Sequence, residues 1–465
     1  MKKLAIVYGE KKTPLQKKAI AILSELLLDY TYEYPYCLSC GDAAAEAYRC
    51  IYIGTKENNA YIRTHSSYML THREEYAFWV ENDTVCIEGY DDAGVLYGCL
   101  DFYNKYLLRE EYPHDDARYR INCFDKPLRD FSYTAYPSVA NRGIWTWGHV
   151  IYDFRGLIDN MVKLKMNTLT VWNDHVPANA ADMVAYAHAC GVKVIWGFSW
   201  LWDTDCKRVD FAHMGEHSEE IFAHYEREYA SLGGDGIYFQ TATEFEEQEI
   251  GGISVAKAVT DFVNKTAAMF YEKYPALEIQ FGLHATSVKS GLEDLRAVDP
   301  RIRIVWENCG AFPFSYIPAD VAHFDETLAF VQEIATLRGE GDRFGVVTKG
   351  FTKLDWGSFT HIEQPVFLGV SSRRMKRDRV ERKSKIWKYI QAYWLENADK
   401  AQEMVALMCR LKQGDLYATP LVEDGMLEEN VMYPVALYAE MLWDVDAPIQ
   451  QLMSEVALRD YVTFA

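Results

Sequence analysis

The chain has 465 residues and a mass of 53.6 kDa, so two or three domains are expected. Its net charge of −20 and pI near 5.1 argue against nucleic acid and anionic membrane surfaces as partners. No apolar run approaches the length needed to cross a bilayer, and the N-terminal residues do not resemble a signal peptide, so we expect a cytoplasmic protein.

The first 125 residues predict a small α+β domain. Its pattern contains short apolar runs typical of strands and two helix-length segments. Strands are expected at residues 4–8, 50–53, 76–80 and 84–88, and helices over residues 15–28 and up to Tyr106. Residues 124–141, with two prolines and little periodicity, predict a linker.

From Arg142 onward, apolar strand-like runs alternate with amphipathic segments of helix length, the pattern of βα units. The predicted strands cover residues 143–147, 168–172, 193–198, 236–240, 278–283, 301–306, 345–349 and 366–370. Eight parallel strands within roughly 230 residues predict an α/β fold, a (β/α)8 TIM barrel over residues 140–375. A doubly wound sheet is the alternative, although no glycine-rich phosphate motif follows a strand. Residues 380–465 predict a helical C-terminal extension.

Ten cysteines, mostly isolated in apolar segments, fit free thiols in a reducing compartment. Cys37 and Cys40 form a CxxC pair, but no second pair or matching histidines accompany it. Neither a metal nor a cofactor is expected.

In a TIM barrel, chemistry is built from residues that follow the C-terminal ends of the strands. These positions are rich in tryptophan, whose flat face suits the apolar face of a sugar ring, although several of these rings, Trp196 above all, would serve as core instead. The predicted substrate contacts are Trp145, Trp147, Trp172, Asn173, Asp174, His175, Trp202, Gln240, His284, Trp306, Lys349 and Trp356; Trp200 lies in the same pattern.

Glu244 is the strongest catalytic candidate. It follows the apolar fourth strand through small residues, where nearby apolar surface would raise the pKa of a carboxyl and keep it protonated. The alternative is a carboxylate at a helix N-terminus, the role expected for Glu246 and Glu247. Cleavage of a glycosidic bond needs a second carboxylate, for which the candidates are Asp355, Glu307 and Asp174.

Two segments resemble glycoside hydrolase families. Residues 87–98, Ile-Glu-Gly-Tyr-Asp-Asp-Ala-Gly-Val-Leu-Tyr-Gly, are similar to the non-catalytic domain that precedes the barrel in β-N-acetylhexosaminidases and microbial α-glucuronidases. Residues 157–169 resemble the first helix and second strand of both barrels. The resemblance implies a hexosaminidase-like N-terminal domain and a catalytic barrel.

Three later segments, residues 236–244, 349–355 and 433–444, resemble the α-glucuronidase group. The resemblance implies that Glu244 is the general acid and Asp355 the base. Gln240 stands where that group has a uronate-binding lysine, and a neutral amide cannot make the same charge-assisted contact. Thr243 stands where hexosaminidases carry the aspartate that polarises the acetamido group.

The sequence thus predicts a glycosidase that removes a terminal sugar, with Glu244 as acid and Asp355, or otherwise Glu307, as base or nucleophile. The alternatives are a hexosaminidase-like enzyme with a substrate-assisted mechanism and a carbohydrate-binding barrel without catalysis. The expected partner is a carbohydrate, and homo-oligomer formation is left open.

Overall fold

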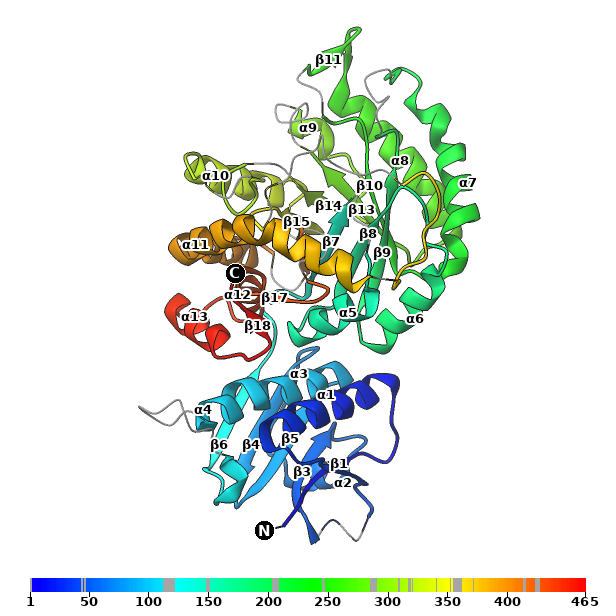
Figure 1. The fold of residues 1–465 in the computed structure, drawn as a ribbon. Coiled ribbons are helices and arrows are strands. Elements are labelled where there is room, and N and C mark those ends of the chain that lie inside the picture. The colour runs from blue at the N-terminus through cyan, green and yellow to red at the C-terminus, as the bar shows by residue number, and fades with distance from the viewer. Residues whose placement is uncertain are drawn as a thin grey trace. The chain divides into compact units, whose positions relative to one another are not determined.

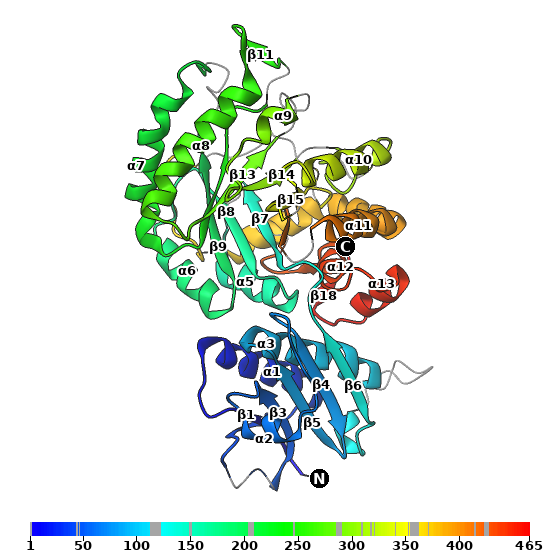
Figure 2. The same ribbon diagram turned by 180° about the vertical axis from the view of Figure 1, so that it is seen from behind.

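The computed structural model describes residues 2–42, 45, 47–111, 122–147, 151–202, 209–244, 247–284, 291–307, 310–316, 319, 321–339, 341–351, 353, 362–370, 372–412, 415–422 and 427–465. The chain divides into two compact units (Figures 1 and 2). The first comprises Met1–Pro137, Ala189–Gly191 and Gln450–Asp460, and the second comprises Ser138–His188, Val192–Ile449 and Tyr461–Ala465.

The first unit is built on a six-stranded sheet with the order β2-β1-β3-β5-β4-β6. Its strands are β1 (Leu4–Tyr8), β2 (Tyr36–Ser39), β3 (Arg49–Gly54), β4 (Tyr76–Glu81), β5 (Thr84–Gly89) and β6 (Phe131–Ala135). Its helices are α1 (Pro14–Thr31), α2 (Ala60–His65), α3 (Asp92–Asp101), α4 (Leu108–Glu111), a π-helix (Phe102–Leu107), a 3-10 turn (Cys123–Asp125) and most of α13 (Ile449–Ala457).

Local sequence explains where these elements begin and end. The Thr13 side chain accepts a hydrogen bond from the Gln16 amide and Pro14 occupies the first turn, so α1 begins there. The predicted linker contains β6, which pairs antiparallel with β4. Pro127 and Pro137 lie on either side of this strand and not within it. Because of these two prolines, the sequence analysis predicted a linker here instead of a strand.

The second unit contains a closed barrel of parallel strands, which confirms the predicted TIM barrel. In chain order the strands are β7 (Asn141–Trp147), β8 (Thr168–Trp172), β9 (Lys193–Ser199), β10 (Gly236–Gln240), β13 (Glu278–Leu283), β14 (Arg303–Trp306), β15 (Phe344–Thr348) and β16 (Leu416–Pro420).

Helices surround these strands (Figure 1). They are α5 (Phe154–Lys163), α6 (Ala180–Ala189), α7 (Ser218–Glu228), α8 (Val255–Lys273), α9 (Leu292–Leu295), α10 (Phe324–Ala335), α11 (Arg373–Leu411) and α12 (Tyr433–Trp443), with 3-10 turns at Met214–His217 and Ala230–Leu232. Two small ribbons are formed by β11 (Glu249–Ile250) with β12 (Ile253–Ser254) and by β17 (Val431–Met432) with β18 (Val462–Thr463).

The eighth strand corrects the sequence prediction. Residues 366–370 form no strand, and Phe367 and Val370 in this segment are exposed. β16 instead pairs with β15 and β7 and closes the barrel. Helix α11 is therefore the barrel helix between the seventh and eighth strands, and the helical part that follows the barrel begins after β16 instead of at residue 380. In the described ranges, no helix is both long enough and apolar enough to span a membrane.

A charged cluster fills the N-terminal end of the barrel. The buried Arg303 guanidinium lies 2.8 Å from Glu278 Oε1 and donates to both carboxylate oxygens of Asp415 at 3.0 Å. It also lies 4.2 Å from the centre of the Tyr417 ring. Paired charges therefore gather at the N-terminal end of the barrel.

Candidate functional site

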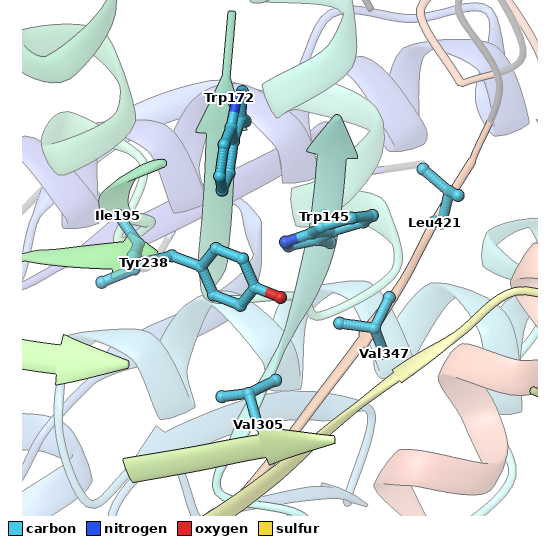
Figure 3. Close-up of a cluster of buried hydrophobic side chains, with 7 residues drawn as sticks. All are labelled: Trp145, Trp172, Ile195, Tyr238, Val305, Val347 and Leu421. Atoms are coloured by element: carbon cyan, nitrogen blue, oxygen red, sulfur yellow. The ribbon is translucent and has the colours of Figure 1, made fainter. Parts of the chain in front are cut away.

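A cluster of buried side chains fills the middle of the barrel (Figure 3). The Trp145 and Trp172 rings meet the Tyr238 ring edge to face, with centroids 5.6 and 6.0 Å apart. Trp145 is 1% exposed and Trp172 is 7% exposed, so both serve mainly as core. The predicted direct substrate contact of Trp145 conflicts with this burial. The other members are Ile195, Val305, Val347 and Leu421.

Glu307 lies directly above this cluster, just past the end of β14, and is 1% exposed. The Tyr238 hydroxyl donates to Glu307 Oε1 at 2.5 Å, and the Gln240 amide nitrogen donates to the same oxygen. Gly282, on the strand between β10 and β14, makes this approach possible, because a Cβ there would overlap the Tyr238 hydroxyl. Three neighbouring strands thus hold one carboxylate in place.

Lys349 supplies the opposite charge. It follows β15, is fully buried, and places its ammonium 3.5 Å from Glu307 Oε2. The ammonium also donates to the Glu307 backbone oxygen at 2.6 Å and to the Tyr316 hydroxyl at 2.5 Å. Two of the three N–H groups of Lys349 are thus used in hydrogen bonds, and the ion pair with Glu307 adds a charged partner.

These positions bear on two predictions. The Glu307 carboxylate is buried and accepts hydrogen bonds from Tyr238 and Gln240. Lys349 is likewise buried, and its ammonium donates to protein groups. The roles of Glu307 as base or nucleophile and of Lys349 as a substrate contact stay predictions.

Glu244 occupies a different environment. It lies past the end of β10 after three buried residues, and its own side chain is exposed to solvent. Many protein atoms nevertheless surround it, and this partial burial is the main reason that the pKa of its carboxyl is raised. The negative charge of Glu307 raises this pKa further, whereas a hydrogen bond from Trp202 and the charge of Lys349 lower it. The direction agrees with the sequence-based expectation.

Trp202 and His284 lie on either side of this position along the barrel, after β9 and β13. Trp202 packs partly buried against the interior cluster, with its ring centroid 6.1 Å from that of Trp172. Burial, aided by the charge of Lys349, lowers the pKa of His284 to about 3, so its imidazole is neutral at physiological pH.

Two tryptophans of the predicted pattern face away from the interior. Trp306 packs against Phe314 and Phe330, with ring centroids 4.5 and 5.4 Å away, because alternation along β14 turns it toward α10. This position contradicts its predicted substrate contact. Trp200 stacks on Phe239 in the same outward layer. Trp196 is buried core, as predicted.

The residues after β8 lie at the C-terminal end of the barrel. Asn173 is half-buried, and Asp174 and His175 are exposed. The Asp174 carboxylate accepts a hydrogen bond from the Ile362 amide at 2.7 Å, which ties this loop to the segment that follows β15. Asp355, Trp356 and the side chain of Trp147 lie outside the described residues.

Sequence reasoning missed Tyr238 and Tyr316. Tyr238 precedes Gln240 by two residues on one strand, so alternation alone places both side chains in the interior. Tyr316 lies well beyond the end of β14, and no strand pattern indicates it. Within the residues that the structure describes, no group of three or more histidine, cysteine or carboxylate side chains is placed to hold a metal ion.

No family model matches the chain, and no curated protein matches it. Solved structures do resemble it. A GH138 enzyme targeting pectin rhamnogalacturonan II aligns with a TM-score of 0.54 and 12% identity over 96% of this chain and 51% of its own. CpGH84B aligns with a TM-score of 0.52 and 11% identity over 98% of this chain and 70% of its own. The chain spans about half the length of the GH138 enzyme, and the likeness shows a shared fold.

Proposed function

We propose that this protein is a glycoside hydrolase in which Glu244 is the general acid. The observation that carries the proposal is the placement of one exposed carboxyl with a raised pKa at the C-terminal end of a TIM barrel. A group that protonates a leaving oxygen must hold its proton near the working pH and must also reach the substrate. The raised pKa of Glu244 supports the first requirement, and the exposure of its side chain supports the second.

The partner carboxylate is proposed to be Asp355, as the α-glucuronidase resemblance implies. Asp174 is a second candidate; it is exposed, and one of its carboxylate oxygens accepts a hydrogen bond from the Ile362 amide. Burial of Glu307 leaves it the role of a fixed charge beneath the acid. The reaction is hydrolysis of a terminal glycosidic bond by two carboxyl groups.

The sugar that the protein cleaves is to be identified with a panel of substrates. Gln240 replaces the expected uronate-binding lysine, and its amide is bonded to Glu307, so neutral sugars are included beside glucuronides and N-acetylhexosaminides. The GH138 enzyme of similar fold targets pectin rhamnogalacturonan II, so oligosaccharides from that polymer complete the panel.

The test compares the wild type, Glu244→Gln and the matched control Glu247→Gln on this panel. Glu247 is also exposed and follows three residues later. General-acid catalysis contributes about 10²–10⁴-fold, so Glu244→Gln is expected to lose at least about 10² in kcat/KM on oligosaccharides. Aryl glycosides carry good leaving groups and should lose much less, while Glu247→Gln should resemble the wild type.

Equal losses in both variants would contradict the role of Glu244. Absence of turnover on every substrate, with sugar binding retained by both the wild type and Glu244→Gln, would instead establish a carbohydrate-binding barrel without catalysis.

A further inference from the structure

A hollow of about 650 Å³ lies in the first unit, in a part of the chain that the proposed reaction does not use. Its walls come from Lys2, from β3 and the residues before it, from the turn between β4 and β5, and from residues 124–127. Binding sites for small molecules have volumes of roughly 300–1,000 Å³, so the hollow is large enough to hold a ligand.

The floor of the hollow is the face of the sheet that α3 does not cover. A Cβ at Gly98 of α3 would lie 2.7 Å from the Ile87 side chain, so α3 packs on the face that carries Ile87. Thr84 of the same strand points to the opposite face, and so does Tyr52, which pairs with Cys86 on the neighbouring strand. Both Thr84 and Tyr52 line the hollow, which therefore opens on the second face of the sheet.

Arg49 fixes the shape of the hollow. Its guanidinium donates to the Asp83 carboxylate at 3.0 Å. It also donates to the backbone oxygen of Phe124 and, at 2.9 Å, to that of Lys126. The Asp83 carboxylate accepts a further hydrogen bond from the Leu128 amide at 2.8 Å. These bonds hold the walls together before any ligand arrives, and binding to such a preformed site costs little conformational entropy.

Aromatic rings form part of the wall. Tyr48, Tyr52 and Phe124 line the hollow. The Tyr48 ring has an exposed neighbour, Tyr36, whose ring centroid is 5.0 Å away, so the aromatic surface continues past the rim. The Tyr52 ring stacks on the Tyr61 ring at 3.6 Å, which holds it in one orientation. Flat rings of this kind suit the apolar faces of sugar rings.

Three polar side chains at the hollow are available to a ligand. Asn82, Asp125 and Lys126 line it and are exposed. Among the described residues, none of these three side chains has a hydrogen-bond or ion-pair partner. Their amide, carboxylate and ammonium groups supply both donors and acceptors. Sugar hydroxyl groups also donate and accept hydrogen bonds, so this mixture beside aromatic rings matches a saccharide.

The charges at the hollow favour a ligand with negative charge. Arg49 and Asp83 neutralise each other in their ion pair. Two lysines, Lys2 and Lys126, then remain against one carboxylate, Asp125, which leaves one positive charge. The whole chain carries a net charge of −20, so this local excess differs in sign from its surroundings. A saccharide that carries a carboxylate group therefore fits the hollow better than a neutral one.

We propose that this hollow binds a saccharide that carries a carboxylate group, with the rings of Tyr48 and Tyr52 against the sugar and Lys126 beside its carboxylate. The proposal does not depend on catalysis by Glu244, and no reaction is assigned to the hollow. It gives the first unit a function of its own, which is to hold acidic saccharides.

The experiment measures binding of trigalacturonate, an acidic trisaccharide, to the full chain by isothermal titration calorimetry at low salt. Lys126→Gln removes the charge of an exposed side chain, so this variant should fold like the wild type. Loss of one charge-assisted hydrogen bond should raise its Kd about tenfold or more. Tyr48→Ala removes one aromatic wall and should raise the Kd about fivefold.

Lys17→Gln is the matched control, because Lys17 is also an exposed lysine of the first unit but does not line the hollow. Its Kd should equal that of the wild type. The neutral galactose trimer should bind the wild type at least about tenfold more weakly than trigalacturonate does.

Equal Kd values for Lys126→Gln and Lys17→Gln would place the binding elsewhere and overturn the proposal. Absence of binding by the wild type, or equal affinity for the neutral trimer, would overturn it as well. Sulfate that displaces trigalacturonate at the same concentration of charge would also overturn it, because the hollow would then be a simple patch of cations.

Discussion

Glu307 and Lys349 bring opposite charges into the barrel interior without exposing either. Removing two ions from water costs several kcal/mol each, and close pairing with further hydrogen bonds offsets that cost. Here the carboxylate has donors from Tyr238 and Gln240, and the ammonium has two oxygen acceptors besides the ion pair. The pair therefore provides a fixed electric field beneath Glu244.

This field predicts a pH effect. The charge of Glu307 raises the pKa of Glu244, so Glu307→Gln should lower that pKa, and the acid should lose its proton at lower pH. The basic limb of the profile of kcat/KM against pH should move to lower pH. The profile is measured well below the melting temperature, because the unpaired Lys349 costs the variant about 3–5 kcal/mol.

Glu278→Gln is the control for this shift, since Glu278 pairs with the buried Arg303 at the far end of the barrel. Its basic limb should coincide with that of the wild type. An unmoved limb in Glu307→Gln, or a limb moved to higher pH, would show that Glu244 does not sense this charge.

The lowered pKa of His284 predicts that the protein loses stability in acid. The unfolded histidine takes up a proton below its ordinary pKa of about 6.5, but the folded one stays neutral down to about 3. The unfolded state therefore binds more protons in this window, and the free energy of unfolding falls as the pH drops through it. His284→Gln removes this contribution and should lose less stability between pH 7 and pH 4.5 in urea unfolding.

His213→Gln serves as the comparison, because Asp210 raises the pKa of the exposed His213. Its stabilising contribution is present at low pH and is lost as the pH rises, so this variant should not reduce the acid sensitivity. If His284→Gln loses as much stability in acid as the wild type, His284 is not the neutral group that the structure indicates.

At the level of elements, Gly282 of β13 leaves room for the hydrogen bond between Tyr238 of β10 and Glu307, which follows β14. In Gly282→Ala the added Cβ would overlap the Tyr238 hydroxyl and lie 2.7 Å from Glu307 Oε1. We expect a loss of about 1–3 kcal/mol in the free energy of unfolding, measured in urea, from overpacking and a displaced buried bond. Gly41→Ala, where the new Cβ meets open space, should be nearly neutral. Similar stabilities for the two variants would contradict this account.

Seven of the eight barrel strands were predictable, because each is an apolar run followed by a helix-length segment. β16 was missed because Pro420 and polar neighbours weaken its pattern, and because the apolar residues 366–370 offered a better match. That run is instead a segment whose Leu368 backbone pairs with the Asn179 side chain at 2.8 and 2.9 Å. Hydrophobicity alone does not distinguish a strand from an apolar loop that is held by hydrogen bonds to Ala178 and Asn179.

In a TIM barrel, functional residues follow the C-terminal ends of the strands, and this rule located most of the interior polar residues. They include Gln240, His284, Glu307 and Lys349. It could not assign their roles, since burial and pairing depend on neighbouring strands. Side chains alternate along β14, so Trp306 faces outward and Glu307 faces inward. Which of the two faces inward depends on the exact position of this strand in the sequence. The contact between Lys349 and Tyr316 joins two loops and leaves no trace in either local pattern.

For the molecule as a whole, the first unit includes residues from both ends of the chain. The Glu455 carboxylate of α13 accepts a hydrogen bond from the buried Lys105 ammonium at 2.6 Å and forms an ion pair with Arg109. Glu455→Gln would remove the carboxylate that pairs with the buried Lys105, so we expect a loss of about 3–5 kcal/mol in the free energy of unfolding. Hydrogen exchange should show the loss in strands β4 to β6, and the exposed Gln450→Ala on the same helix should not cause it. Unchanged exchange in β4 to β6 would contradict this coupling.

Both units are completed by residues that come late in the sequence, and this has a consequence for synthesis on the ribosome. The strand that closes the barrel begins at Leu416, and the first unit lacks part of its structure until residues 450–460 have emerged. Neither unit can reach its final state while most of the chain is being translated. Partly made chains would expose open sheet edges during elongation, so this protein should depend on chaperones while it is being made.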